Sequence, residues 1–158
     1  MSACLLGETC RYDGRSKPCA RVQELVALGH ELVPICPEVT GGLPTPRTPC
    51  EIVRAPWMKG KKAPAANERS WAILDASGAD RTAAYARGAQ AELARAKETG
   101  CELAILKAKS PSCGSGEVYD GTFSGTLVPG WGIAAATFRD AGITVIDETA
   151  DFSRLANG

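Results

Sequence analysis

The sequence has little histidine, few aromatic residues, no net charge and no long apolar run. His30 is the only histidine among 158 residues, and aromatic side chains make up 6% of the chain. Lys+Arg and Asp+Glu both number 18, so no overall field favours nucleic acid. No segment reaches the length of a membrane span, and the N-terminus lacks the pattern of a secretory signal. We therefore expect a cytoplasmic protein with no membrane partner and no evident nucleic-acid partner, its oligomeric state being left open.

Cysteine is abundant by comparison. The chain has seven cysteines, an odd number that cannot pair completely into disulfides. In a reducing compartment such cysteines are more often thiols, metal ligands or catalytic groups. With 44% hydrophobic residues and a mean hydropathy of -0.10, the chain can bury one substantial core. We expect a single domain over residues 1–158 whose chemistry rests on cysteine.

Short apolar runs alternate with segments of helical periodicity along the chain. Val22, Leu25 and Val26 recur at helical spacing, and Gly29 follows in the position that ends helices. The pattern predicts strands at 1–7, 31–35, 103–106 and 143–146, helices at 19–28, 80–99 and 130–141, an ambiguous segment at 71–74, and long loops at 39–62, with a solvated tip at 59–62, and at 116–129. Such alternation indicates an α/β fold, Rossmann-like and three-layered, with a small, largely parallel sheet of about four strands.

Three cysteines lie on loops that follow apolar runs or strands. Cys10, Cys36 and Cys113 are each flanked by polar, Gly or Pro residues that make poor core. Because ligands of an open parallel sheet bind outside the carboxyl ends of its strands, we expect these thiols to converge. Taken singly, each is more often a small buried hydrophobic residue, and Cys4 is the alternative member of the set. The remaining cysteines are interpreted as incidental: Cys19, Cys50 and Cys101.

Three thiolates without a histidine partner suit an iron–sulfur cluster or zinc, with one coordination position open. His30 precedes a predicted strand at its amino end and is interpreted as a surface residue. Glu38 and Ser110 lie close in sequence to Cys36 and Cys113. A carboxyl group there can act as general acid or base, and a hydroxyl can relay a proton. The alternative is that Glu38 is a solvated loop residue and that Ser110 only forms a turn.

Charged side chains near the same loops have ordinary roles as well as functional ones. Four cations could hold a carbonyl or a phosphate group: Arg11, Arg47, Lys107 and Lys109. Asp13 and Asp120 are each followed by Gly, which predicts turns.

Six short blocks run in order along the chain, nearly from end to end. They are SACLLG at 2–7, CRYDG at 10–14, VPICPEV at 33–39, GGLPTPR at 41–47, SPSCG at 110–114 and YDGTFSG at 119–125. Together they resemble the signature blocks of the thiouracil desulfidase family.

The resemblance implies a [4Fe-4S] cluster held by Cys10, Cys36 and Cys113, with one iron open to take sulfur from a thiolated pyrimidine. It places Glu38 and Ser110 at the positions of the catalytic pair. The implied activity is non-redox desulfuration of thiouracil to uracil, a hydrolysis of the C=S bond that releases hydrosulfide. A different class of function, a non-catalytic iron–sulfur or sulfide carrier, would use the same three thiols. Turnover without an electron donor separates the two.

Overall fold

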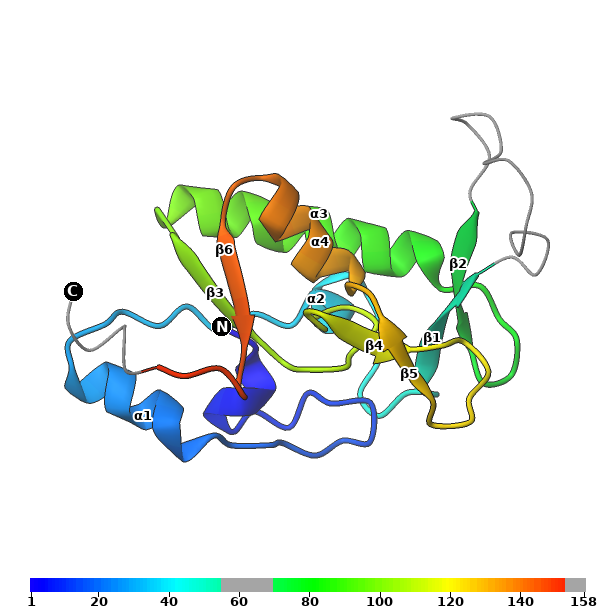
Figure 1. Ribbon diagram of the computed structural model, residues 1–158, viewed down its shortest axis with the longest axis horizontal. Helices are drawn as coiled ribbons and strands as arrows, with labels where there is room; N and C mark the ends of the chain where they lie inside the picture. The colour runs from blue at the N-terminus through cyan, green and yellow to red at the C-terminus, as the bar shows by residue number, and fades with distance from the viewer. Residues whose placement is uncertain (55–69, 153–158) are drawn as a thin grey trace.

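Helices and short strands form a mixed α/β arrangement (Figure 1). The computed structural model describes residues 1–54 and 70–152, and the predicted tip at 59–62 lies outside them. The helices are η1 (Ala3–Leu6, a 3₁₀ helix), α1 (Ala20–Ala27), α2 (Pro37–Thr40), α3 (Thr82–Glu98) and α4 (Ile133–Asp140). The strands are β1 (Cys50–Arg54), β2 (Trp71–Asp75), β3 (Leu103–Leu106), β4 (Glu117–Tyr119), β5 (Leu127–Pro129) and β6 (Thr144–Asp147). In this part of the chain no helix is both long and apolar enough to cross a membrane.

Strands β3 and β6 form a parallel pair between the helices. Leu103–Leu106 pairs in register with Thr144–Asp147. Because successive side chains of a strand point to opposite faces, Ala104 and Leu106 join one hydrophobic cluster while Ile105 joins another. Strand β3 is therefore buried on both faces, which explains why its sequence is a continuous apolar run.

The segment at 1–3 runs beside β3, and the segment that ends at Ile35 runs beside 1–3, without forming a regular ladder. The amide of Ser2 donates to the carbonyl of Ile105 at 3.0 Å, and the amide of Ala3 donates to the carbonyl of Ile35 at 2.8 Å. Ser2 and Ile35 form only an isolated parallel bridge. The predicted sheet of about four parallel strands is thus not confirmed, because the parallel ladder contains two strands with these short segments alongside.

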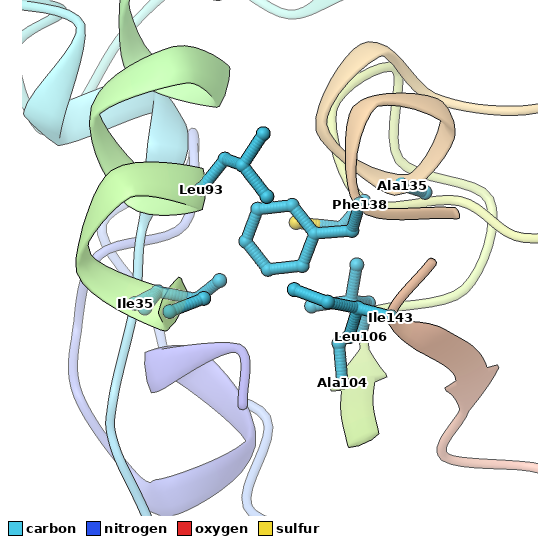
Figure 2. Packing of buried hydrophobic residues seen from close by; sticks show 9 residues of the cluster. Ile35, Leu93, Ala104, Leu106, Ala135, Phe138 and Ile143 are labelled. Atoms are coloured by element: carbon cyan, nitrogen blue, oxygen red, sulfur yellow. The ribbon is translucent and has the colours of Figure 1, made fainter. Parts of the chain in front are cut away.

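Helices α3 and α4 cover one face of the β3–β6 pair. Leu93 of α3 and Phe138 of α4 belong to the same cluster as Leu106 and Ile143. Figure 2 shows the Phe138 ring between Leu93 on one side and Leu106 and Ile143 on the other. Phe138 is 1% exposed, and full burial of such a side chain stabilises a fold by about 1.5–3 kcal/mol. This cluster fixes the end of β3, where the loop that carries Cys113 begins.

The opposite face of β3 is covered by α1 and η1. Val22 and Leu25 of α1 pack in one cluster with Leu5 of η1. The predicted strand at 1–7 is wrong beyond its first residues. The amide of Leu5 donates back to the carbonyl of Ser2 at 3.0 Å, so the chain turns inward beneath α1 instead of continuing beside β3.

Two antiparallel pairs lie at the other end of the molecule (Figure 1). Strand β1 pairs with β2, and β4 pairs with β5. The predicted loops at 39–62 and 116–129 therefore contain strands, and the ambiguous segment 71–74 is one. Ile52, Ile73, Tyr85 and Val118 form the core that these strands share with α3.

The three predicted helices are confirmed with slightly shorter bounds, as α1, α3 and α4. Neither Asp80 nor Thr82 occupies the N-cap position of α3, which is Arg81. Thr82 Oγ1 instead accepts a hydrogen bond from the amide of Ile73 at 2.9 Å. The residue therefore ties the start of α3 to β2.

Candidate functional site

A cavity of about 740 Å³ opens where loops from distant parts of the chain meet. Its wall includes residues of the loop after η1, the first turn of α2, the start of β1 and the loops after β3 and β4. All five predicted site residues line it: Cys10, Cys36, Glu38, Ser110 and Cys113. The structure therefore brings these five residues to one space, and their individual roles stay predictions.

The three cysteines reach the cavity from three separate segments. Cys10 is half-buried on the loop after η1, and Cys36 is the N-cap residue of α2. Cys113, on the loop after β3, is 6% exposed. The Cys36 thiol donates a weak hydrogen bond to the carbonyl of Cys10, with 3.9 Å between Sγ and O. All three are free thiols.

The surroundings hold these groups as protonated thiols at neutral pH. Burial raises the pKa of Cys113 to about 12. The hydrogen bond with Cys10, together with burial, raises the pKa of Cys36. A hydrogen bond with Cys36 lowers the pKa of Cys10, but a hydrogen bond with Cys4 and burial outweigh it and raise that pKa to about 11. A metal centre that binds thiolates here would displace their protons.

Cys10, Cys36 and Cys113 are the lining residues that could hold a metal centre, because thiolates bind zinc and iron–sulfur clusters. Among the described residues, no three His, Cys, Asp or Glu side chains form a group that could hold one ion. Ser112 Oγ, next to Cys113 in sequence, is in this part of the chain the one buried side-chain oxygen or nitrogen without a hydrogen-bond partner.

Glu38 and Ser110 are in contact inside the cavity. Ser110 Oγ lies 3.4 Å from Glu38 Oε1 and accepts hydrogen bonds from the amides of Ser112 and Cys113, each at 3.1 Å. Because those two bonds occupy its acceptor sites, the hydroxyl hydrogen is directed at the carboxylate. Ser110 thus forms the turn that the sequence suggests and also touches Glu38.

Arg47 fixes the position of Glu38. Its Nε lies 2.7 Å from Glu38 Oε2, and its Nη2 donates to the carbonyl of Cys10 at 3.0 Å. The Glu38 side chain is 13% exposed, so its interpretation as a solvated loop residue is wrong. Arg47, which the sequence suggested as an anchor for a bound group, is occupied by the protein's own groups. It joins the Cys10 loop to α2.

Other charged residues near the cavity are also paired. Lys107 forms an ion pair with Glu148, whose second oxygen accepts a hydrogen bond from the amide of Ala108 at 2.7 Å. Arg11 pairs with Asp13 at 3.2 Å. Asp13 and Asp120 accept hydrogen bonds from amides two residues further on, which confirms the turns predicted at both.

Sequence reasoning missed part of the cavity wall. Tyr85 of α3, for which the sequence suggested no functional role, is 1% exposed and lines the cavity, and burial raises its pKa. Cys50, interpreted from the sequence as incidental, also lines it, as does Cys4, the alternative member of the predicted thiol set. The usable signal was a tyrosine in an otherwise apolar stripe, because a buried phenol needs a polar neighbour.

Two glycines allow α2 to lie directly on α3. A Cβ at Gly88 of α3 would stand 1.7 Å from the carbonyl oxygen of Pro37, and a Cβ at Gly41 would stand 2.1 Å from that of Ala84. Glycine inside a helix costs about 1 kcal/mol relative to alanine, so the close approach explains its presence. This contact sets the start of α2, with Glu38, against α3.

The fold and the site together define a small mixed α/β protein with a thiol-lined cavity that also holds a carboxylate and a hydroxyl. The family model described as 2-thiouracil desulfurase matches residues 1–150, and the chain belongs to this family. The resemblance seen in the six sequence blocks is therefore confirmed.

Two relatives show how far the similarity extends. An uncharacterised Bacillus subtilis (strain 168) protein, YbbK, is 42% identical over 148 residues, which cover 94% of this chain and 93% of that protein. The solved structure of the [4Fe-4S]-dependent thiouracil desulfidase TudS superposes with a TM-score of 0.77 at 39% identity, covering 99% of this chain and 92% of that one.

Proposed function

We propose that this protein hydrolyses the C=S bond of a thiolated pyrimidine, converting thiouracil and water into uracil and hydrosulfide without a redox step. The family and the likeness to TudS support this reaction class. The observation that carries the proposal is the contact between Ser110 and Glu38 inside a cavity whose wall includes Cys10, Cys36 and Cys113. These groups supply a proton acceptor, a proton relay and a set of metal ligands in one place.

Cys10, Cys36 and Cys113 would hold a [4Fe-4S] cluster with one iron not bound by the protein. When bound, the cluster would supply a Lewis acid for the thiocarbonyl sulfur.

Glu38 would take a proton from the water that attacks the ring carbon. Arg47 holds the carboxylate at 2.7 Å, and the Ser110 hydroxyl, at 3.4 Å from the other oxygen, orients it or relays the proton. A C–O bond forms, the C–S bond breaks, and the hydrogens of water leave with the sulfur or with solvent. The balance needs no electron donor.

The test uses protein reconstituted with iron and sulfide under anaerobic conditions and incubated with 2-thiouracil without a reductant. We expect one sulfide released for each uracil formed. Glu38→Gln should keep the visible absorbance of the cluster and lower kcat by roughly 10²- to 10⁴-fold, as for a lost general acid–base group. Glu117→Gln, an exposed change on β4, is the matched control and should leave kcat unchanged.

Three outcomes would contradict the proposal in different ways. A requirement for a reductant would exclude the non-redox reaction. A full cluster without turnover of any thiolated pyrimidine would favour the carrier function. Loss of the cluster in Glu38→Gln would make Glu38 a structural residue.

A further inference from the structure

Both non-glycine residues with positive φ in the described chain line the cavity. They are Lys109, with φ of 67°, and Phe123, with φ of 57°. A bulky residue in this left-handed region is strained, and such strain persists only where the surrounding structure enforces it. Phe123 is the more unusual of the two because its side chain is a large apolar ring.

A buried carboxylate enforces the conformation of Phe123. Glu51 of β1 is 8% exposed, and its Oε2 accepts hydrogen bonds from the amides of Gly121 at 2.9 Å and Phe123 at 3.0 Å. A Cβ at Gly121 would stand 2.7 Å from the carbonyl oxygen of Ile52, so the loop lies directly on β1. The loop between β4 and β5 is therefore held against two adjacent residues of β1, Glu51 and Ile52.

The loop is also braced from within. Asp120 accepts a hydrogen bond from the Thr122 hydroxyl at 2.6 Å, and that hydroxyl lies 2.7 Å from Ser124 Oγ. Ser124 Oγ lies 2.8 Å from Thr126 Oγ1. These contacts hold the tip of the loop rigid on both sides of Phe123.

This anchoring leaves the Phe123 ring at the cavity with much of its surface uncovered. Phe123 is 40% exposed, and Tyr12, which lines the cavity from another loop, is 44% exposed. Because so much of the ring is exposed, its burial adds little stability to set against the cost of the left-handed backbone. Its exposed face is free for a flat ligand.

We propose that Phe123 is a specificity-determining residue that stacks on the planar ring of the pyrimidine substrate, with Glu51 as the positioning residue that holds it there. The inference rests on the proposed function for the identity of the ligand. Stacking of a base on an aromatic side chain is worth a roughly 5- to 150-fold change in affinity. It also selects a flat ring over a puckered one with the same polar edge.

The test compares Phe123→Asn, Phe123→Tyr and wild type. Asparagine accepts a left-handed backbone better than phenylalanine and removes the ring, whereas tyrosine keeps the ring. Phe123→Asn should raise KM for 2-thiouracil, and the Kd for uracil measured by calorimetry, by roughly 5- to 150-fold with a smaller change in kcat. Its Tm should stay the same or rise, and its cluster absorbance should be unchanged. Phe123→Tyr should bind as wild type does.

The ligand is varied in the same experiment. Wild type should bind uracil more tightly than 5,6-dihydrouracil, whose ring is puckered, and Phe123→Asn should lose that preference. An equal Kd for uracil in wild type and Phe123→Asn, or no measurable binding by wild type, would overturn the stacking. If wild type turns over no thiolated pyrimidine while the loss of affinity remains, the proposed function fails and the stacking stands.

Glu51 is tested through the loop that it anchors. Glu51→Ala should raise KM as Phe123→Asn does, and the double variant should be no worse than either single one, because both remove the same contact. Glu51→Gln, which keeps an accepting oxygen, should restore much of the affinity. Additive effects in the double variant would show that Glu51 does not act through Phe123.

Discussion

Some of the cysteines line the cavity and others lie outside it, so mutation can distinguish the proposed ligands from the rest. We predict that Cys10→Ser, Cys36→Ser and Cys113→Ser each lose the broad visible absorbance of the reconstituted cluster, because each removes one thiolate ligand. Iron and acid-labile sulfide assays measure the loss. Cys19→Ser and Cys101→Ser are the controls, since neither residue lines the cavity, and they should keep both. A full cluster in Cys113→Ser would exclude the proposed ligand set.

At the same scale, the sequence identified residues that share the cavity but not how they are held. Cys10, Cys36 and Cys113 could be selected because each follows an apolar run, a local feature. The ion pair of Glu38 with Arg47 joins α2 to a separate loop, and only the folded chain shows it. The sequence did not indicate a role for Glu51. Its strand lies in a segment rich in Gly and Pro, which predicts a loop and therefore no buried carboxylate.

At the scale of elements, the contact between α2 and α3 places the Glu38 carboxylate. We predict that Gly88→Ala destabilises the protein by about 1–3 kcal/mol, as overpacking does, although alanine is the better helix former by about 1 kcal/mol. The added Cβ would meet the carbonyl of Pro37 and push α2 away, so cluster content and kcat should fall as well. Urea unfolding and iron content measure the two effects.

An exposed position on the same helix supplies the control. Ala91→Gly should cost about 1 kcal/mol of stability through helix propensity alone and leave cluster and kcat unchanged. A Gly88→Ala variant that is more stable than wild type and fully active would show that α2 does not depend on this contact.

Elements with a long or strongly apolar pattern were predictable, and short antiparallel ones were not. The 17 residues of α3 are enough for helical periodicity to be recognised, and the continuous apolar run of β3 is enough to predict a buried strand. Strands β4 and β5 have three residues each, too few for an alternation to stand out from a Gly-rich loop. The apolar residues at 1–7 resemble a strand in sequence. In the structure Leu5 belongs to η1, and its apolar side chain packs beneath α1.

At the scale of the whole molecule, the proposed ligands join segments that are far apart in sequence. We predict that removing the cluster lowers Tm by about 5–11 °C, the shift that corresponds to about 2.7 kcal/mol of linked binding energy at a hundredfold excess over Kd. Anaerobic calorimetry of cluster-loaded and cluster-free protein measures the difference. Cys36→Ser, treated in the same way, should show no shift. An equal Tm for both forms of wild type would mean that the cluster does not stabilise the assembled loops.

The spread of the three thiols along the chain also sets an order of events during synthesis. Cys113 is translated 103 residues after Cys10, an interval of roughly 5–21 s at about 5–20 residues per second. On the proposed ligand set, the nascent chain has no complete binding site until most of the protein has left the ribosome. Maturation is therefore a late step, and the cellular machinery that delivers iron and sulfur would meet a nearly finished polypeptide.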